Sequence, residues 1–304
     1  MRVLEFTVPP RYDGVKAKVF LRSFCQLSAR TMIRLKQVPD GITADGKHLR
    51  TIDPVHSGQI VVLHLPEESH PMQEAADLPV PVIYEDDDVT VYDKPPYMPI
   101  HPSAGHACDT LANAAAARSA ARGTVELFRP INRLDSNTSG LAVTARHAHA
   151  AARLSGKIEK IYLAVTEGIP PALGTIDAPL RTMEGHGIRR EIGDDGEQAI
   201  THWHTIATGS GHALLRVVIE TGRTHQIRAH FSCTGYPLAG DDMYDGHSAH
   251  IARHALHCTA VRFIQPITGE VIRLTAPLPE DFLRLLASLS ISEPDIPALL
   301  SHFP

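Results

Sequence analysis

Cysteine is scarce in this chain, and its copies lie far apart. The four are Cys25, Cys108, Cys233 and Cys258. Because no two of them form a Cys-x-x-Cys pair, the sequence favours neither a disulfide framework nor a zinc ribbon, and we expect reduced thiols in a cytoplasmic protein. Long apolar runs are missing as well: charged residues interrupt the start of the chain, and the alanine run 114–117 stops at Arg118. We therefore expect no membrane segment and no export signal.

An overall excess of positive charge is also absent, since the formal net charge is -5. The charge is, however, unevenly distributed along the chain. Residues 11–50 contain nine basic groups against three acidic ones, a net charge of +6, which leaves -11 for the rest. Phosphate contacts need cations gathered on one surface. The basic segment is therefore where we expect contact with a polyanion.

The basic segment has a regular pattern of its own. Apolar residues recur with helix-like spacing at positions 21, 27, 33 and 35, and Arg30 and Arg34, four apart, would share one helical face. Asp45-Gly46 predicts a tight hairpin turn, and Gly58 opens an apolar strand. Two helices, a hairpin and a final strand resemble the S4-like RNA-binding module, which we expect over residues 1–65. The alternative is an ordinary solvated basic face on a small α/β cap.

The remaining sequence predicts a linker and a larger α+β domain. Residues 66–81 are polar and proline-rich, as linkers are, and residues 82–304 form the domain. Strands are expected at 88–93, 140–144, 158–166, 200–206, 213–221 and 260–264. Helices are expected at 110–122, 147–154, 224–234 with Thr224 as its cap, and 280–289. No internal repeat is apparent, and no glycine-rich phosphate loop follows a strand.

A single carboxylate stands out in residues 133–140, Arg-Leu-Asp-Ser-Asn-Thr-Ser-Gly. Asp135 follows a cation and precedes a polar turn and the apolar run 141–143. Such a turn fixes a backbone corner beside the acid, and corners of this kind often hold reacting groups on a rigid scaffold. Taken alone, the segment is better explained by an aspartate that caps its own turn. Other segments decide between the two interpretations.

Four further segments accompany this one in a fixed order. They are Tyr84 to Ser103 with Lys94-Pro95-Pro96 inside it, Lys160 to Val165, Thr221 to Asp241 with Tyr244 beyond it, and Ala255-Leu256-His257 before Ala276-Pro277-Leu278-Pro279. Together they resemble the RluA/RluD-type family of RNA pseudouridine synthases from about residue 82 to residue 282. The chain departs from the family at Asn132, where a histidine is usual, and at Pro96-Tyr97, where many relatives carry a small residue and glycine.

The resemblance implies both a fold and a reaction. The fold would be a mixed, mostly antiparallel bent sheet with helices on its faces and a cleft across its middle. The reaction would isomerise uridine to pseudouridine, which needs neither redox change nor energy input, so no cofactor and no metal is expected. Asp135 would be the reacting carboxylate, attacking the sugar or the base or assisting proton removal from the sugar.

Two further residues would complete the catalytic set. By family match, Arg228 would orient Asp135 through a bidentate salt bridge and keep it ionised. The less favoured alternative for Arg228 is a surface arginine on a helix that contacts phosphate. Tyr162 would offer a face for the uracil and a phenol near carbon 5; without the resemblance it would be plain strand core.

RNA binding would involve a separate set of residues. Because a stacked uridine must be extruded before it can react, Arg133 is expected to fill or line the vacated space. Leu256 would cover the second face of the base, although core packing explains it nearly as well. In the N-terminal module, phosphate contacts are expected from Arg30, Arg34 and Lys36.

Some alternatives remain at this point. His247, His250, His254 and His257 have the spacing of a metal-binding helix face, which would favour a metal-dependent hydrolase. A non-catalytic RNA-binding or ribosome-assembly protein could use the same N-terminal module. For an enzyme, large-subunit ribosomal RNA is favoured over transfer RNA as the substrate, and a monomer is the default. His147 and His149 are expected to be exposed.

Overall fold

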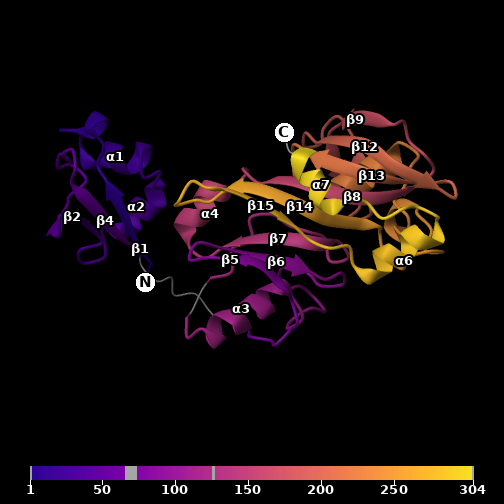
Figure 1. The fold of residues 1–304 in the computed structure, drawn as a ribbon, viewed down its shortest axis with the longest axis horizontal. Helices are drawn as coiled ribbons and strands as arrows, with labels where there is room; N and C mark the ends of the chain where they lie inside the picture. Colours follow the sequence, from indigo (N-terminus) through magenta and orange to yellow (C-terminus); the bar gives the residue numbers. More distant parts are fainter. Residues whose placement is uncertain (1, 66–73, 125–126, 303–304) are drawn as a thin grey trace.

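The computed structural model describes residues 2–65, 74–124 and 127–302, and Figure 1 shows two units in it. The smaller one, here called the N-terminal unit, comprises residues 2–65. It contains β1 (Arg2–Thr7), η1 (Pro10–Tyr12), α1 (Ala17–Ser23), α2 (Ala29–Leu35), β2 (Ile42–Ala44), β3 (Lys47–His48) and β4 (Ile60–Leu65). Its strands form a four-stranded sheet of their own in the order β1-β4-β2-β3. The expected linker lies partly outside the described residues, at 66–73.

The N-terminal unit has its own apolar core, to which both helices contribute. The predicted hairpin turn is confirmed: Asp45 and Gly46 join β2 to β3 with φ values of 48° and 75°, as a tight two-residue turn requires. Ser28 caps α2 by accepting a hydrogen bond from the Thr31 amide. The predicted apolar spacing is wrong at Ile33, which is 59% exposed.

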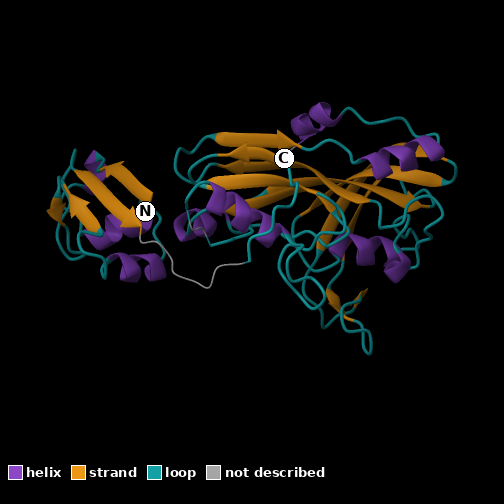
Figure 2. Cartoon of the chain, turned by 90° about the horizontal axis from the view of Figure 1, so that it is seen from below, coloured by secondary structure: helices purple, strands orange, loops and turns teal. Residues whose placement is uncertain are grey.

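The larger unit is built on a nine-stranded sheet, which Figure 2 shows as a group of strands separate from the N-terminal sheet. Its order is β5-β6-β7-β14-β8-β13-β12-β9, and β15 pairs with the far part of β14. Only the β7–β14 pairing is parallel within it, so the prediction of a mixed, mostly antiparallel sheet is confirmed. The strands are β5 (Val82–Glu85), β6 (Val89–Lys94), β7 (Ser139–Ala145), β8 (Glu159–Glu167), β9 (Leu173–Asp177), β12 (Ile200–Gly209), β13 (His212–Ile219), β14 (Leu256–Ile264) and β15 (Val271–Thr275).

Helices and short elements accompany this sheet. They are α3 (Leu111–Ala121), α4 (Ala148–Leu154), the small pair β10 (Leu180–Thr182) and β11 (Arg190–Ile192), α5 (Gln226–Cys233), η2 (Asp242–Tyr244), α6 (Glu280–Ser288), α7 (Ile296–Leu299) and η3 (Leu300–His302). No helix in the described ranges is long and apolar enough to cross a membrane.

Strand β8 runs through the middle of the domain and is buried on both faces. Tyr162 and Ala164 belong to the apolar cluster on one side, whereas Ile161 and Leu163 belong to the cluster that Phe282 of α6 shares on the other. Successive side chains of a strand point to opposite faces, so both faces of this strand are covered. This explains why its sequence is a continuous apolar run rather than an alternating one.

Two local predictions are wrong. Helix α5 begins at Gln226, and its cap position is occupied by His225 in a left-handed conformation (φ 55°) rather than by Thr224. His149, expected to be exposed, is buried, and burial lowers the pKa of its imidazole to about 4. His147 is half-buried and caps α4 through its ring, which accepts from the Ala150 amide.

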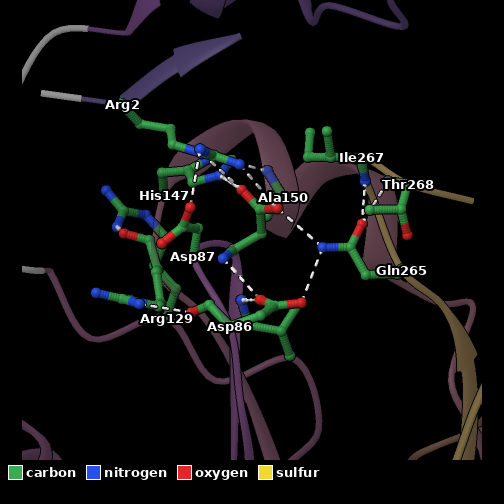
Figure 3. Close-up of polar contacts among 12 residues, drawn as sticks. Arg2, Asp86, Asp87, Arg129, His147, Ala150, Gln265, Ile267 and Thr268 are labelled. Atoms are coloured by element: carbon green, nitrogen blue, oxygen red, sulfur yellow. Dashed lines mark hydrogen bonds and ion pairs between the residues drawn. The ribbon is translucent and has the colours of Figure 1, made fainter. Parts of the chain in front are cut away.

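A polar cluster joins the two units (Figure 3). Arg2 of β1 donates to both oxygens of Asp88 (3.0 and 3.3 Å), which also contacts His147 and Gln265. Burial alone would raise the pKa of Asp88, but these hydrogen bonds outweigh it and hold the pKa at about 2. The stabilisation from this carboxylate is therefore present above about pH 4 and is lost as the pH falls toward 2. Ile267 packs beside the cluster on the N-terminal core.

Replacing Arg2 by alanine should loosen the contact between the units. Asp88 would keep His147 and Gln265, so we expect a loss of about 1 kcal/mol in the docked arrangement and a larger radius of gyration in solution X-ray scattering. Lys47→Ala, a change on exposed β3 of the same unit, is the control. Identical scattering from both variants would show that Arg2 does not hold the units together.

Candidate active site

Asp135 lies on the segment that leads into β7, and Asn132 fixes the start of that segment. The Asn132 amide donates to the Leu141 carbonyl (3.0 Å) and accepts from the Val143 amide (2.8 Å), and the Ile131 amide adds a bond to the Val143 carbonyl. An asparagine side chain supplies both a donor and an acceptor, so it can bridge two backbone groups of one strand. The segment that carries Asp135 is thereby fastened alongside β7.

The two residues after Asp135 are held by hydrogen bonds from buried cations to their backbone carbonyls. The buried Lys94 ammonium donates to the Ser136 carbonyl (2.9 Å), and the buried Arg253 guanidinium donates to the Asn137 carbonyl (3.0 Å). Each group binds a backbone oxygen, so these two contacts do not depend on the side chains of Ser136 and Asn137. Burial, together with repulsion from Arg253, lowers the pKa of Lys94 to about 7, whereas Asp135 acts in the opposite direction.

The same loop ends in side-chain hydrogen bonds and a close backbone contact. The Thr138 hydroxyl pairs with His254 (2.8 Å) and the Ser139 hydroxyl with His257 (2.9 Å). Gly140 has φ 104°, and a Cβ atom there would lie 2.3 Å from the Cys258 carbonyl oxygen. Glycine is therefore required for β7 to approach β14 at this point.

Arg228, in the first turn of α5, links Asp135 to a second carboxylate. One guanidinium nitrogen donates to Asp135 Oδ2 (3.1 Å), while Nε and Nη2 donate to the two oxygens of Asp241 (2.7 and 2.8 Å). The predicted contact between Arg228 and Asp135 is thus present, but the bidentate pair forms with Asp241. Because Arg228 is 5% exposed, the interpretation as a surface phosphate contact is wrong.

An aromatic ring and a histidine complete the surroundings of this ion pair. The guanidinium of Arg228 lies 4.9 Å from the ring centre of Tyr244, within the range of a cation–π contact. The Tyr244 hydroxyl is 3.0 Å from Nδ1 of His225, whose Nε2 lies 3.9 Å from Asp135 Oδ2. Burial lowers the pKa of His225, with Asp135 opposing, so the ring is neutral at neutral pH.

Tyr162 and Leu256 lie on neighbouring strands at the core of the domain. Tyr162 of β8 is opposite Cys258 of β14 and is 5% exposed. Burial raises the pKa of its phenol well above the ordinary value, and Cys258 and Asp135 add to the effect. Leu256, the first residue of β14, is equally buried and shares an apolar cluster with Tyr162.

Comparison with known proteins identifies the chain. The sequence profile of the RNA pseudouridylate synthase family matches residues 88–233. The ribosomal large subunit pseudouridine synthase D of Pseudomonas aeruginosa is 37% identical over 275 residues, which cover 83% of this chain and 85% of that protein. The chain belongs to the RluA/RluD-type family of RNA pseudouridine synthases. It is therefore an isomerase that acts on RNA.

Other relatives agree with this assignment. An uncharacterized RNA pseudouridine synthase of Chloroflexus aurantiacus is 35% identical over 291 residues, covering 93% of this chain and 92% of that protein. The solved structure of human RNA pseudouridylate synthase domain containing 4 superposes with a TM-score of 0.57 at 20% identity, covering 70% of this chain and 94% of that one. That likeness confirms the fold of the synthase domain.

Several residues around the loop that carries Asp135 were not predicted to take part. Lys94, Asp241 and Tyr244 stand in the segments that resemble the family, but only the folded structure shows that they gather around Asp135 and its loop. The histidine spacing had suggested a metal site instead. His254 and His257 bind different hydroxyls, and among the described residues no group of three metal-ligating side chains is found.

The predicted RNA-binding residues are distributed over both units. Arg133, two residues before Asp135, is exposed. Partial burial lowers the pKa of the His101 ring, and the charge of Arg133 lowers it further. Arg30, Arg34 and Lys36 lie on or beside α2 of the N-terminal unit, with Arg30 and Lys36 exposed and Arg34 half-buried. The structure thus places Arg30, Arg34 and Lys36 on a different unit from Asp135.

Replacing Arg228 by lysine should disable the site. An ammonium keeps the charge but cannot span both carboxylates as the fork does, and it leaves buried Asp241 underpaired. We expect a loss of about 3 kcal/mol in unfolding free energy and of at least about 100-fold in turnover, measured by denaturant titration and by tritium release from carbon 5 of uridine.

Arg223→Lys is the matched control, because Arg223, five residues before Arg228, forms an exposed ion pair with Glu197. It should change neither quantity appreciably. If Arg228→Lys behaved like this control, the fork geometry would be unnecessary.

Proposed function

We propose that Asp135 is the reacting carboxylate of this pseudouridine synthase. The supporting observation is its asymmetric environment: Oδ2 is bound by buried Arg228, whereas Oδ1 accepts no hydrogen bond from the described residues, and the side chain is 27% exposed. A carboxylate oriented through one oxygen and open at the other can meet a substrate without reorganising its surroundings.

The reaction needs few groups besides this one. The bond between C1′ and N1 of uridine breaks, the uracil turns in place, and C5 bonds to C1′; the C5 proton is lost and N1 gains one. Asp135 would attack at the sugar or at the ring, or assist proton removal from the sugar. Atoms and electrons balance within the nucleotide, so the proposed mechanism uses no cofactor.

We propose supporting roles for four residues. Arg228 orients Asp135 and keeps it ionised, since the guanidinium is itself fixed by Asp241. Tyr162 faces the uracil as a protonated phenol, because its raised pKa disfavours the phenolate at neutral pH. Leu256 lines the same apolar side of the site, and exposed Arg133 lines the space that the flipped uridine leaves.

The substrate we favour is large-subunit ribosomal RNA. The relatives from Pseudomonas aeruginosa and Xanthomonas campestris are both named ribosomal large subunit pseudouridine synthase D. The N-terminal unit adds a compact fold whose basic helix could contact structured RNA, as in an S4-like module. Transfer RNA is the second candidate, and a non-catalytic assembly role is the third. In this proposal the enzyme works as a cytoplasmic monomer.

Asp135→Asn tests the proposed nucleophile. The amide keeps the shape of the side chain but not its charge or nucleophilicity, so folding should be retained while turnover falls by at least about 10³-fold. The assay is tritium release from RNA labelled at C5 of uridine and purified from cells that lack the gene. Asp242→Asn, at the exposed position that follows Asp241 in the sequence, is the control. A folded Asp135→Asn variant with substantial activity would show that another group reacts.

The N-terminal unit is tested by the double variant Arg30→Ala with Lys36→Ala. If both side chains contact phosphates, RNA affinity should fall. The negative slope of log K against log salt should also become shallower by about 1.5. Turnover at saturating RNA should persist, because neither residue belongs to the catalytic domain. Lys157→Ala, an exposed change in that domain, serves for comparison. An unaltered slope in the double variant would remove the phosphate contacts from the proposal.

A further inference from the structure

Tyr97 adopts a backbone conformation that its side chain disfavours. Its φ is 62°, in the left-handed region, where a bulky residue without a short polar side chain is rare. Eight described residues other than glycine have positive φ, and five of them are aspartate or serine. Tyr97 is the large aromatic residue in the set, so this position favours a smaller residue on backbone grounds alone.

The ring of Tyr97 contributes little to the packing of the fold. Tyr97 is 53% exposed and belongs to none of the apolar clusters. Within the described residues its hydroxyl forms no hydrogen bond and its ring has no aromatic neighbour. A disfavoured residue that persists without packing is typical of functional positions, since stability would select glycine or asparagine here.

The loop that carries Tyr97 is fastened to the reacting loop. The Lys94 ammonium binds the carbonyls of Pro95, Met98 and Ser136 at 2.8 to 2.9 Å, and the Met98 amide donates to the same Ser136 carbonyl (3.2 Å). Two consecutive prolines before Tyr97 restrict the backbone further. The ring is therefore presented from a rigid support that is bonded to the residue after Asp135.

Other residues near the Tyr97 loop and in the Asp135 segment suit a single-stranded nucleic acid. His101, four residues after Tyr97, is exposed, and its ring meets Phe128 edge to face with centres 5.2 Å apart. Arg133, whose charge adds to the lowering of the His101 pKa, is exposed two residues before Asp135. Aromatic faces together with a cation form the usual platform for unpaired bases and their phosphates.

We propose that Tyr97 stacks on an unpaired base of the substrate RNA next to the uridine that enters the active site, and so keeps the strand open around it. This inference rests on the proposed function at Asp135. Stacking needs the ring face and not the hydroxyl. It also explains why an exposed aromatic side chain is retained at a position of positive φ.

The test separates stability from binding. In Tyr97→Gly and Tyr97→Asn the residue tolerates the left-handed backbone but lacks the ring, so the melting temperature should be no lower than that of the wild type. Affinity for a labelled single-stranded oligouridine probe should nevertheless fall about 10-fold or more. Tyr97→Phe and Tyr97→Trp should stay within about threefold of the wild type in affinity.

Ser290→Gly is the matched control. Ser290 has a similar left-handed backbone conformation (φ 57°) at an exposed position in another part of the chain. Glycine there should change the melting temperature about as much as Tyr97→Gly does, without altering RNA affinity. Affinity is measured in the Asp135→Asn background, in which turnover cannot interfere, and tritium release is measured with Asp135 intact.

The outcomes are distinct. Weaker binding by the Gly and Asn variants, with retention by Phe and Trp, would support stacking even if no wild-type turnover were found, in which case only the proposed reaction would fail. Wild-type affinity in the Gly and Asn variants would overturn the stacking role, whether or not uridine is isomerised. Equal loss in the Phe variant would also overturn it, since the ring would not be the group that binds.

Discussion

The site depends on one buried guanidinium shared by two carboxylates. Arg228 uses Nε and Nη2 for Asp241, whose side chain is fully buried, and its remaining nitrogen for Asp135, which is partly exposed. The buried pair cannot be separated without leaving an uncompensated charge. Arg228 therefore has a fixed position before any substrate binds, and Asp135 is oriented by a group that is itself immobile.

The loop that follows Asp135 is likewise held by buried groups, which here bind mainly its backbone. Lys94 and Arg253 are buried cations that bind loop carbonyls, and Arg253 is in turn held by Asp281. The hydroxyls of Thr138 and Ser139 pair with buried histidines. Because successive loop residues bond to different strands or turns, the loop cannot shift as a whole without breaking contacts in several elements at once.

Sequence alone predicted what depends on local pattern and on motif. The longer strands were found because a strand buried on both faces, such as β8, is a continuous apolar run. Short strands such as β9 and β10 have exposed polar residues and were missed. Thr224 was expected to cap α5 because threonine suits that position; instead His225 occupies it, beside the hydroxyl of Tyr244. The fork to Asp241 could not be predicted, since a motif shows which residues are present but not how three charges divide their bonds.

Concentrating buried cations around one loop is unfavourable for folding stability. A gain in stability therefore does not explain why these cations are buried. Apolar residues of similar volume would often serve folding as well or better than a buried ion pair. Lys94 shows the cost directly, because burial and the nearby Arg253 lower its pKa to about 7 and thus disfavour the charge that it carries. What apolar residues cannot do is donate hydrogen bonds to the carbonyls of Ser136 and Asn137. The buried charges are thus better explained by the need for a rigid carboxylate than by stability, in keeping with the general opposition of activity and stability at reactive sites.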